Sequence, residues 1–453
     1  MRNSQGKYTA ASGISVAYGY KSKSELLRGW LVYKLISYDV IVNSLPKLIR
    51  WSSNIFGQNL FEKLMRTTLY GQFVAGTKTD EVKQIVDKFK QYNVKVILDY
   101  SMESDISTSI TASNNVHKSS FNTELDESNT FKIYHPDERI FNTNMFNYIK
   151  NSNTSRELCG QSSFIAMKIT ALVRPLVLQK LNQFLESRIT DHNLFDTIDS
   201  LLTTKNDFTH SLTPNELGEI SNLLLRINRI IQTVKKNEGR IFIDAEQSYF
   251  QTAINKIVIH LQRLYNRNNL LVYNTYQCYK KNTLNILRDD LKKSKEDGFY
   301  IGYKLVRGAY MDQERRHAVE TGVEDPIHSN FNATTECYKQ ALVETLNFTE
   351  SNFVRVLVAS HNEDTVRFAL EQMEKRGIKP ADELMSFATL FGMCDYITFT
   401  LAKSGFQVYK LTPYGPLSSL LPYLTRRAQE NRGIFAKAYK DRLLHYQALK
   451  DRL

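Results

Sequence analysis

The chain has 453 residues, of which 42% are hydrophobic and 11% aromatic, a composition typical of a globular protein with a sizeable core. Lys and Arg number 59 against 47 Asp and Glu, so the formal charge is +12, which suits anionic ligands, nucleic acid or an anionic membrane surface. The basic residues are interspersed with acids and form no run of about five or six, so a nucleic-acid-binding tract is not favoured.

Cysteine usage and hydropathy argue against further classes. The four cysteines stand far apart with no CxxC pair, which disfavours a zinc cage or a disulfide framework and favours a reducing compartment. No stretch of about 18 apolar residues occurs, and the most apolar candidate, LVYKLISYDVIVNSL, is interrupted by Lys34 and Asp39. We therefore expect no membrane-spanning helix, while contact with a membrane surface stays open.

The N-terminal part of the chain has two predicted regions. Residues 1–23 carry four basic residues and no acid, and they are rich in Ser, Ala, Gly and Tyr. Both a mitochondrial leader and a disordered tail fit that composition. Residues 24–93 are predicted to be a helical arm, because SELLRGWLVYKLISYDVIVNSL and NLFEKLMRTTLY have apolar residues at helical spacing.

From residue 94 onward, short apolar and β-branched runs alternate with longer helical patterns such as AINKIVIHLQRLYN and EDTVRFALEQMEKRG. The runs are 94–100, 163–172, 240–246, 270–277, 300–308, 354–362, 384–392 and 406–415. Strand–helix alternation predicts a parallel sheet, and eight repeats predict an α/β fold closed into a (βα)8 TIM-type barrel over residues 94–432. An open doubly wound sheet is the alternative, although no GxGxxG follows a strand.

Two polar segments interrupt this alternation. Residues near 101–160 and 189–215 are rich in Asn, Ser and Thr, and we expect them to be insertions or mobile loops with partial disorder. Residues 433–453 are predicted to form a C-terminal helix.

Candidate site residues follow from the barrel, because barrel enzymes build their sites at the carboxyl ends of the strands. The polar residues predicted at these strand ends include no nucleophile–base pair and no metal cluster, and the chain contains no HExxH or GxSxG. It is rich in cations, which favours an anionic ligand with the hard chemistry done by an organic cofactor. The polar residues at these ends are Asp99, Glu103, Lys168, Thr170, Asp244, Glu246, Asn274, Gln277, Lys304, Arg307, His361, Asn362, Lys410 and Tyr414.

The stretch PYLTRRAQEN adds Arg426 and Arg427 one turn before Glu430, on the helix expected after the last strand. Two guanidinium groups together with Lys168 are suited to hold a substrate carboxylate, while Asp244 and Glu430 would offset excess positive charge. The plain alternative is a solvated helix face with one weak ion pair. Placement of all these groups at one predicted rim favours the binding interpretation.

Several ordered motifs carry a resemblance to a known family. FIDAEQSYFQ, YNTYQCY, YKLVRGAYMDQER, VASHNEDTVRFAL, FGMCD, VYKLTPYGP and PYLTRRAQENR follow one another as in proline dehydrogenases, and YGQFVAG and VILDYSMESD extend the match. The resemblance is closest to the stand-alone eukaryotic branch, and it covers most of residues 24–432 apart from the polar insertions. Hydroxyproline dehydrogenases share nearly all of these motifs.

The resemblance implies a distorted (βα)8 barrel that holds FAD non-covalently. It also implies oxidation of L-proline to Δ1-pyrroline-5-carboxylate, the first step of proline catabolism, by hydride transfer from ring carbon C5 to flavin N5. Ubiquinone would accept the electrons, and the location would be the matrix side of the inner mitochondrial membrane, with peripheral membrane contact. No metal is implied.

Residue roles are implied in the same way. Lys168, Arg426 and Arg427 match residues that grip the substrate carboxylate. Asp244 matches the active-site aspartate, and Glu430 the glutamate of the arginine motif. Tyr310 and Leu390 match residues that shape the proline pocket. The flavin-contacting positions are matched by Gln277, Lys304, Val306, Arg307, Ala309, Thr334 and His361, with Lys304 standing where many bacterial members carry arginine.

Two positions depart from the family pattern. Thr389 stands where glutamine is common, and Leu411 stands where proline dehydrogenases usually place tyrosine and hydroxyproline enzymes a smaller residue such as serine. An apolar wall rejects an added hydroxyl only weakly, so we expect activity on proline with appreciable use of 4-hydroxyproline. The alternatives are a hydroxyproline dehydrogenase and, with less support, a non-catalytic barrel that only binds ligands.

Overall fold

The computed structural model describes residues 17–100, 135–187, 212–348, 354–432 and 435–453, without the side chains of residues 46–56, 58, 422, 429–432 and 435–438. The expected leader or tail at residues 1–16 lies outside the described residues. So do residues 101–134 and 188–211, which hold most of the two expected insertions.

Eight parallel strands form a closed barrel in the order β1-β2-β3-β4-β5-β6-β7-β8. This confirms the predicted (βα)8 architecture, and the open doubly wound alternative is wrong. Each predicted run contains one strand, although the run 163–172 is mostly not strand, because the chain turns into a short 3-10 helix, Ile169–Ala171, after β2. The strands are β1 Val94–Tyr100, β2 Phe164–Met167, β3 Arg240–Ile243, β4 Val272–Gln277, β5 Ile301–Val306, β6 Val354–Ala359, β7 Met385–Leu390 and β8 Val408–Tyr414.

The chain divides into two compact units. The first comprises the residues up to Ser101 together with Glu157–Ser163 and Arg355–Leu453, and the second comprises Met102–Arg156 and Phe164–Val354. Strands β2 to β5 belong to the second unit, where β2 pairs with β3, β3 with β4 and β4 with β5. In the first unit β6 pairs with β7, β7 with β8 and β8 with β1. Pairing fixes which strand ends lie side by side within each unit.

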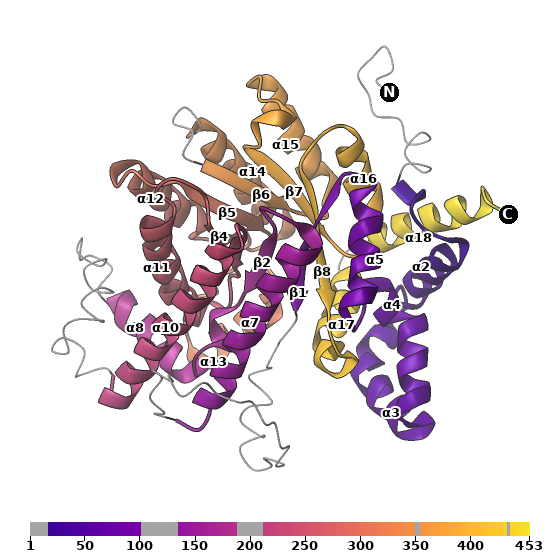
Figure 1. The fold of residues 1–453 in the computed structure, drawn as a ribbon, viewed down its shortest axis with the longest axis horizontal. Helices are drawn as coiled ribbons and strands as arrows, with labels where there is room; N and C mark the ends of the chain where they lie inside the picture. The colour runs from indigo at the N-terminus through magenta and orange to yellow at the C-terminus, as the bar shows by residue number, and fades with distance from the viewer. Residues whose placement is uncertain (1–16, 101–134, 188–211, 349–353, 433–434) are drawn as a thin grey trace. The chain divides into compact units, whose positions relative to one another are not determined.

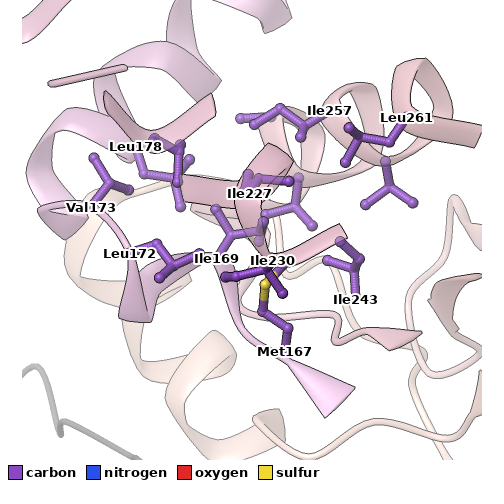
Figure 2. Packing of buried hydrophobic residues seen from close by; sticks show 14 of the residues in the cluster. Met167, Ile169, Leu172, Val173, Leu178, Ile227, Ile230, Ile243, Ile257 and Leu261 are labelled. Atoms are coloured by element: carbon purple, nitrogen blue, oxygen red, sulfur yellow. The ribbon is translucent and has the colours of Figure 1, made fainter. Parts of the chain in front are cut away.

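The second unit has its core between strands β2 to β4 and the helices outside them (Figure 1). Figure 2 shows Met167 and Ile243 from adjacent strands packed near Ile227 and Ile230 of a helix. That helix starts where the sequence provides a capping box, Thr213 with Glu216. The helices are α7 Glu138–Cys159, α8 Pro175–Ser187, α10 Pro214–Lys236, α11 Ser248–Tyr265, α12 Thr283–Glu296, α13 Met311–Thr321 and α14 Phe331–Asn347.

The first unit contains the N-terminal helices and the C-terminal helix. Helices α2 and α18 lie side by side (Figure 1), and they meet at Gly29, where a Cβ would be only 2.3 Å from the His445 ring. A residue larger than glycine would therefore force these helices apart. The helices are α2 Lys23–Leu35, α3 Asp39–Thr67, α4 Leu69–Phe73, α5 Thr79–Lys90, α15 Glu363–Lys375, α16 Asp395–Lys403, α17 Leu417–Arg432 and α18 Phe435–Lys450.

Candidate active site

Asp244, which directly follows β3, is bound by two lysines: Lys168, directly after the adjacent strand β2, and Lys304, within β5. The Lys168 Nζ lies 2.7 Å from Asp244 Oδ2, and the Lys304 Nζ lies 2.7 Å from Asp244 Oδ1. The parallel pairing of β2 with β3 explains the first contact, since the backbone N–H of Asp244 donates to the carbonyl of Met167, the residue before Lys168. Three residues, each 60 or more positions from the next in sequence, are thus brought into one charged cluster.

The charge state of this cluster follows from its surroundings. Burial alone would raise the pKa of Asp244, but the two ammonium groups outweigh it and hold that pKa well below the ordinary value. The side chains are only 24%, 14% and 19% exposed for Lys168, Lys304 and Asp244. The carboxylate is therefore ionised at neutral pH and keeps both ammonium groups at fixed positions.

Glu246, two residues further on, is a site residue to which the sequence assigned no role. Thr170 donates to its carboxylate through both its backbone N–H and its hydroxyl, and the Gln277 Nε2 donates to its backbone carbonyl at 2.7 Å. Burial is the largest influence on Glu246 and raises its pKa, although Lys168 and Thr170 act in the opposite direction. The sequence signals were its predicted place at a strand end and its position in the motif DAE, two residues after Asp244.

The loop after β5 carries Arg307, Ala309 and Tyr310. Arg307 donates to Thr335 Oγ1 at 3.1 Å, and its guanidinium lies 4.4 Å from the centre of the Phe331 ring. Burial lowers the pKa of Arg307, but arginine remains charged near neutral pH. Gly308 has φ +143°, and a Cβ there would lie 2.4 Å from the Tyr279 ring, so the loop can approach Tyr279 only with glycine.

The second unit thus gathers most of the predicted flavin-contacting residues at strand ends. Gln277 ends β4, Lys304 and Val306 lie in β5, Arg307 and Ala309 follow it, and Thr334 is buried in the first turn of α14. Tyr310 lies directly before α13.

The donors in this unit suit an anionic organic cofactor. Lys304 and Arg307 supply cationic donors, and Gln277 and Thr334 supply neutral ones, which match phosphate and ring carbonyl oxygens. Two cations, Lys168 and Lys304, contact one ionised carboxylate, Asp244, so this cluster has an excess of positive charge. An anionic ligand would balance that excess.

In the first unit, three predicted site residues lie on or beside adjacent strands. His361 follows β6, and its Nε2 accepts from the backbone N–H of Leu390, the last residue of β7, at 2.9 Å. Leu390 pairs in register with Leu411 of β8. Thr389 points elsewhere, since its hydroxyl lies 2.7 Å from the Thr398 hydroxyl of α16. The side chain of Thr389, which departs from the family pattern, therefore lies toward α16.

Helix α17 carries the two adjacent arginines. Arg427 is 7% exposed, and its guanidinium lies 4.8 Å from the centre of the Tyr423 ring, whereas Arg426 is partly exposed. Arg427 therefore does not lie on a solvated helix face, which was the plain alternative for this residue. Glu430 belongs to α17, but its side chain lies outside the described ones.

Lys410, one of the polar residues predicted at the strand ends, does not face the candidate site. Its side chain is fully buried and forms an ion pair of 2.8 Å with Asp395, and it donates to backbone carbonyls of residues Leu390 and Met393. It therefore does not belong to the cations that face a ligand. Along β8 successive side chains alternate between faces, and Lys410 takes the face opposite to Leu411.

Behind β4, the Tyr276 hydroxyl donates to Asp290 Oδ2 of α12 at 2.7 Å, and burial raises the pKa of Asp290 to about 7. An unfolded Asp titrates near 3.9, so the folded state loses stability as pH rises from about 4 to about 7. We expect Asp290→Asn to flatten this dependence and to stabilise the fold by roughly 2 kcal/mol at about pH 8, after discounting for partial exposure. Thermal unfolding at several pH values measures this, with Asp289→Asn on the exposed face as control. Parallel pH profiles for Asp290→Asn and the parent would contradict the prediction.

Comparisons with known proteins agree with this arrangement. The family model "Proline dehydrogenase" matches residues 82–438. Mitochondrial proline dehydrogenase 1 of Drosophila melanogaster is 32% identical over 542 residues, covering 96% of this chain and 80% of the relative. The human protein of the same name is 32% identical, with 96% and 88% covered. Hydroxyproline dehydrogenase of Xenopus laevis is also 32% identical, with 96% and 88% covered.

Among solved structures, proline utilization A from Bdellovibrio bacteriovorus inactivated by N-propargylglycine aligns with a TM-score of 0.62 and 17% identity. The alignment covers 93% of this chain but only 38% of that protein, so the likeness concerns the fold of one part of it. Taken with the family match and the curated relatives, these findings show that the chain belongs to the proline dehydrogenase family of oxidoreductases.

Proposed function

We propose that this chain is an FAD-dependent dehydrogenase that oxidises L-proline to Δ1-pyrroline-5-carboxylate, the first step of proline catabolism. Family membership supports proline oxidation. The observation that carries the chemistry is the Lys168–Asp244–Lys304 cluster, two ammonium groups held 2.7 Å from one carboxylate at the ends of the barrel strands. Two fixed cations beside a single carboxylate are suited to an anionic substrate and an anionic cofactor.

The proposed roles divide between substrate and cofactor. Lys168, Arg426 and Arg427 bind the substrate carboxylate, because guanidinium groups match both of its oxygens. A fixed carboxylate orients the substrate ring and removes the entropic cost of positioning it during the reaction. When bound, FAD supplies the acceptor for the hydride that leaves the substrate ring.

Lys304 and Arg307 hold positive charge where negative charge develops on the cofactor, and being fixed in advance they need little reorganisation. Asp244 keeps Lys168 and Lys304 in place without neutralising both of them. The remaining cofactor contacts are proposed for Gln277, Val306, Ala309, Thr334 and His361.

Leu411 is the proposed determinant of substrate choice. It lies in register with Leu390, so two leucines would wall the β7–β8 part of the proposed pocket. We expect kcat/KM for proline to exceed that for 4-hydroxyproline by less than about 100-fold, because an apolar wall rejects a hydroxyl only weakly. Changing Leu411→Ser should move that ratio toward hydroxyproline. A hydroxyproline preference in the parent above about tenfold would favour the hydroxyproline dehydrogenase alternative.

An anaerobic titration tests the proposed activity directly. The purified protein should be yellow, and its flavin absorbance should bleach when proline is added in the absence of oxygen. Repeating the titration with 4-hydroxyproline ranks the two substrates in one experiment. A colourless protein that cannot be reconstituted with FAD would support the non-catalytic binding alternative.

We further propose a mitochondrial location, electron transfer to ubiquinone and peripheral contact with the inner membrane. The relatives named above as proline dehydrogenase 1 are mitochondrial by name. In the described part of the chain, no helix has the length and apolarity needed to cross a bilayer. The proposed contact is made by a surface of the protein.

A candidate for that surface lies on α2 and α18. Both helices expose an apolar stripe at helical spacing, with members 37% to 52% exposed, and Trp30 lies against Tyr446 with ring centres 6.4 Å apart. Aromatic and leucine side chains beside lysine suit the interface of an anionic bilayer. The exposed members are Leu27, Leu31 and Leu35 on α2 and Tyr439, Leu443 and Tyr446 on α18.

We expect Leu31→Glu combined with Leu443→Glu to abolish co-sedimentation with vesicles of phosphatidylcholine and cardiolipin. Two charges would be forced into the lipid interface, while proline oxidation with a soluble acceptor should stay unchanged. Leu264→Glu is the matched control, because Leu264 is 55% exposed on α11, which belongs to the other unit. Undiminished vesicle binding by the double variant would exclude this surface.

A further inference from the structure

The turn that follows β7 is held by side chains to an unusual degree. It comprises residues 390–394, from Leu390 to Cys394, directly before α16. Gly392 has φ +77° and Cys394 has φ +52°, so two of its five residues are left-handed. A Cβ on Gly392 would lie 1.9 Å from the Gln72 carbonyl oxygen, so no other residue fits there.

The carbonyl groups of this turn accept hydrogen bonds from buried side chains of other elements. Lys410 of β8 donates to Leu390 at 3.2 Å and to Met393 at 2.5 Å. Gly392 accepts from the Tyr33 hydroxyl of α2 and from the Gln72 amide of α4, both at 2.8 Å. The donors Tyr33, Gln72 and Lys410 are all at most 3% exposed.

The amide groups of the turn are held as well. The Cys394 N–H donates to Asp441 Oδ2 of α18 at 3.4 Å, and the Phe391 N–H donates to the Leu411 carbonyl at 2.9 Å. With the bond that the Leu390 N–H donates to His361, more than half of the polar backbone groups of the turn have a partner named here. Leu390 therefore has little freedom to move.

Behind the turn, Asp395 joins Lys410 to the residues directly before α2. Its carboxylate lies 2.8 Å from Lys410 Nζ and 2.8 Å from Lys21 Nζ, and it accepts from the Tyr20 hydroxyl at 2.8 Å. Burial alone would raise the pKa of Asp395, but the two lysines outweigh it and lower that pKa far below the usual range. The Asp395 carboxylate therefore stays ionised inside the protein.

His445 of α18 completes the connection. Burial lowers its pKa to about 3, so the ring is neutral near pH 7. Its Nε2 lies 2.9 Å from the Lys21 ammonium and accepts from it, which leaves Nδ1 to donate to the Asp441 carbonyl at 2.7 Å. The chain around Lys21 and helix α18 are thus linked, through buried polar groups, to the turn after β7.

Stability alone does not account for such a network. Burying two lysines and one aspartate is costly, and apolar residues of similar volume often stabilise a core as well or better. Buried polar networks do fix a single geometry, because every member must keep its partners. A reason for that geometry exists at Leu390, the one turn residue that is also a proposed pocket residue.

We propose that Lys410 is a positioning residue for substrate binding. With Tyr33, Gln72 and Asp441 it sets the turn 390–394, so that Leu390 forms a preformed wall of the proline pocket, and the elements at the two chain ends serve this site. The inference rests on the proposed function for the identity of the substrate. It assigns a role in substrate affinity to residues that touch neither substrate nor cofactor.

The test is a set of variants assayed for KM and kcat with a soluble acceptor, together with bound flavin and thermal stability. Tyr33→Phe combined with Gln72→Met removes both side-chain donors to Gly392 and should raise KM for proline about 5- to 10-fold with kcat nearly unchanged. Lys410→Met should raise KM by at least about tenfold.

Tyr303→Phe is the matched control, since its buried hydroxyl, 2.6 Å from Thr345 Oγ1, lies in the other unit. It should lower stability slightly without changing KM. Lower stability with an unchanged KM in the double variant would overturn the inference, as would an equal rise of KM in Tyr303→Phe. If Lys410→Met does not fold, the KM of the double variant alone decides whether the inference holds. A parent whose flavin is not bleached by proline would instead refute the proposed function.

Discussion

Replacing Arg427 by Met is expected to raise KM for proline about 100-fold while leaving FAD bound, because a carboxylate anchored in a largely buried site would lose its guanidinium partner. Arg427 is 7% exposed, so little water is available to substitute for it. Removing one partner of a buried, hydrogen-bonded charge pair costs about 2–5 kcal/mol, and about 2.7 kcal/mol corresponds to 100-fold. Steady-state kinetics and the ratio of flavin to protein absorbance measure the two parts of the prediction.

Conservative and remote variants separate the carboxylate clamp from other effects. Arg427→Lys should recover only part of the loss, because an ammonium group keeps the charge but not the fork. Arg426→Met should act in the same direction as Arg427→Met. Arg66→Met is the control for the loss of an arginine that stacks on a tyrosine and has no proposed role in substrate binding, since Arg66 of α3 lies 5.4 Å above the Tyr70 ring of α4 and pairs with Glu81. Substrate binding unchanged in both arginine variants would dismiss the clamp.

The barrel and its strand ends were accessible from sequence because they depend on local periodicity. Alternating apolar runs and helical patterns define the strands, and parallel strands necessarily bring their carboxyl ends together. That rule alone places Lys168, Asp244 and Lys304 near one another, and the structure shows all three in contact. No knowledge of side-chain packing was needed for this part.

The buried network around Lys410 was not accessible in the same way. Lys410 and Leu411 are adjacent at a strand end, and sequence does not tell which of them faces the site. The answer depends on Asp395, which starts α16, and on Lys21, nearly the whole chain away. Long-range charge pairing decides such cases, and one sequence contains no periodic signal for it.

Helix α7 illustrates a different limit. The segment 101–160 appeared uniformly polar, yet its later part forms a helix of 22 residues. Met145 and Tyr148 anchor it in the core of the second unit, and Asn151 is buried beside them along the helix. Polar composition hides the few apolar contacts that stabilise this helix, because tertiary packing outweighs local propensity.

The second large effect is expected at Asp244. Changing Asp244→Asn keeps the size and one acceptor oxygen but removes the charge that holds two ammonium groups. Lys168 and Lys304 would then repel each other and lose their fixed positions. We expect kcat/KM to fall about 1000-fold, equivalent to roughly 4 kcal/mol of transition-state stabilisation. Stability should fall by about 2–3 kcal/mol, since breaking a partly buried pair leaves unpaired charge.

The pH dependence distinguishes this role from simple packing. Because the folded-state pKa of Asp244 is lowered, its contribution to stability is present above about pH 4 and is lost as pH falls below that value. Asp244→Asn should therefore be less sensitive to acid than the parent.

Glu25→Gln is the control variant. It breaks a pair of similar exposure, Lys88 with Glu25 at 2.8 Å, and should lower stability without the loss of kcat/KM. Equal kcat/KM losses in both variants would mean that Asp244 only supports the fold. A loss confined to Asp244→Asn would mean that its charge sets the positions of the cations on which the reaction depends.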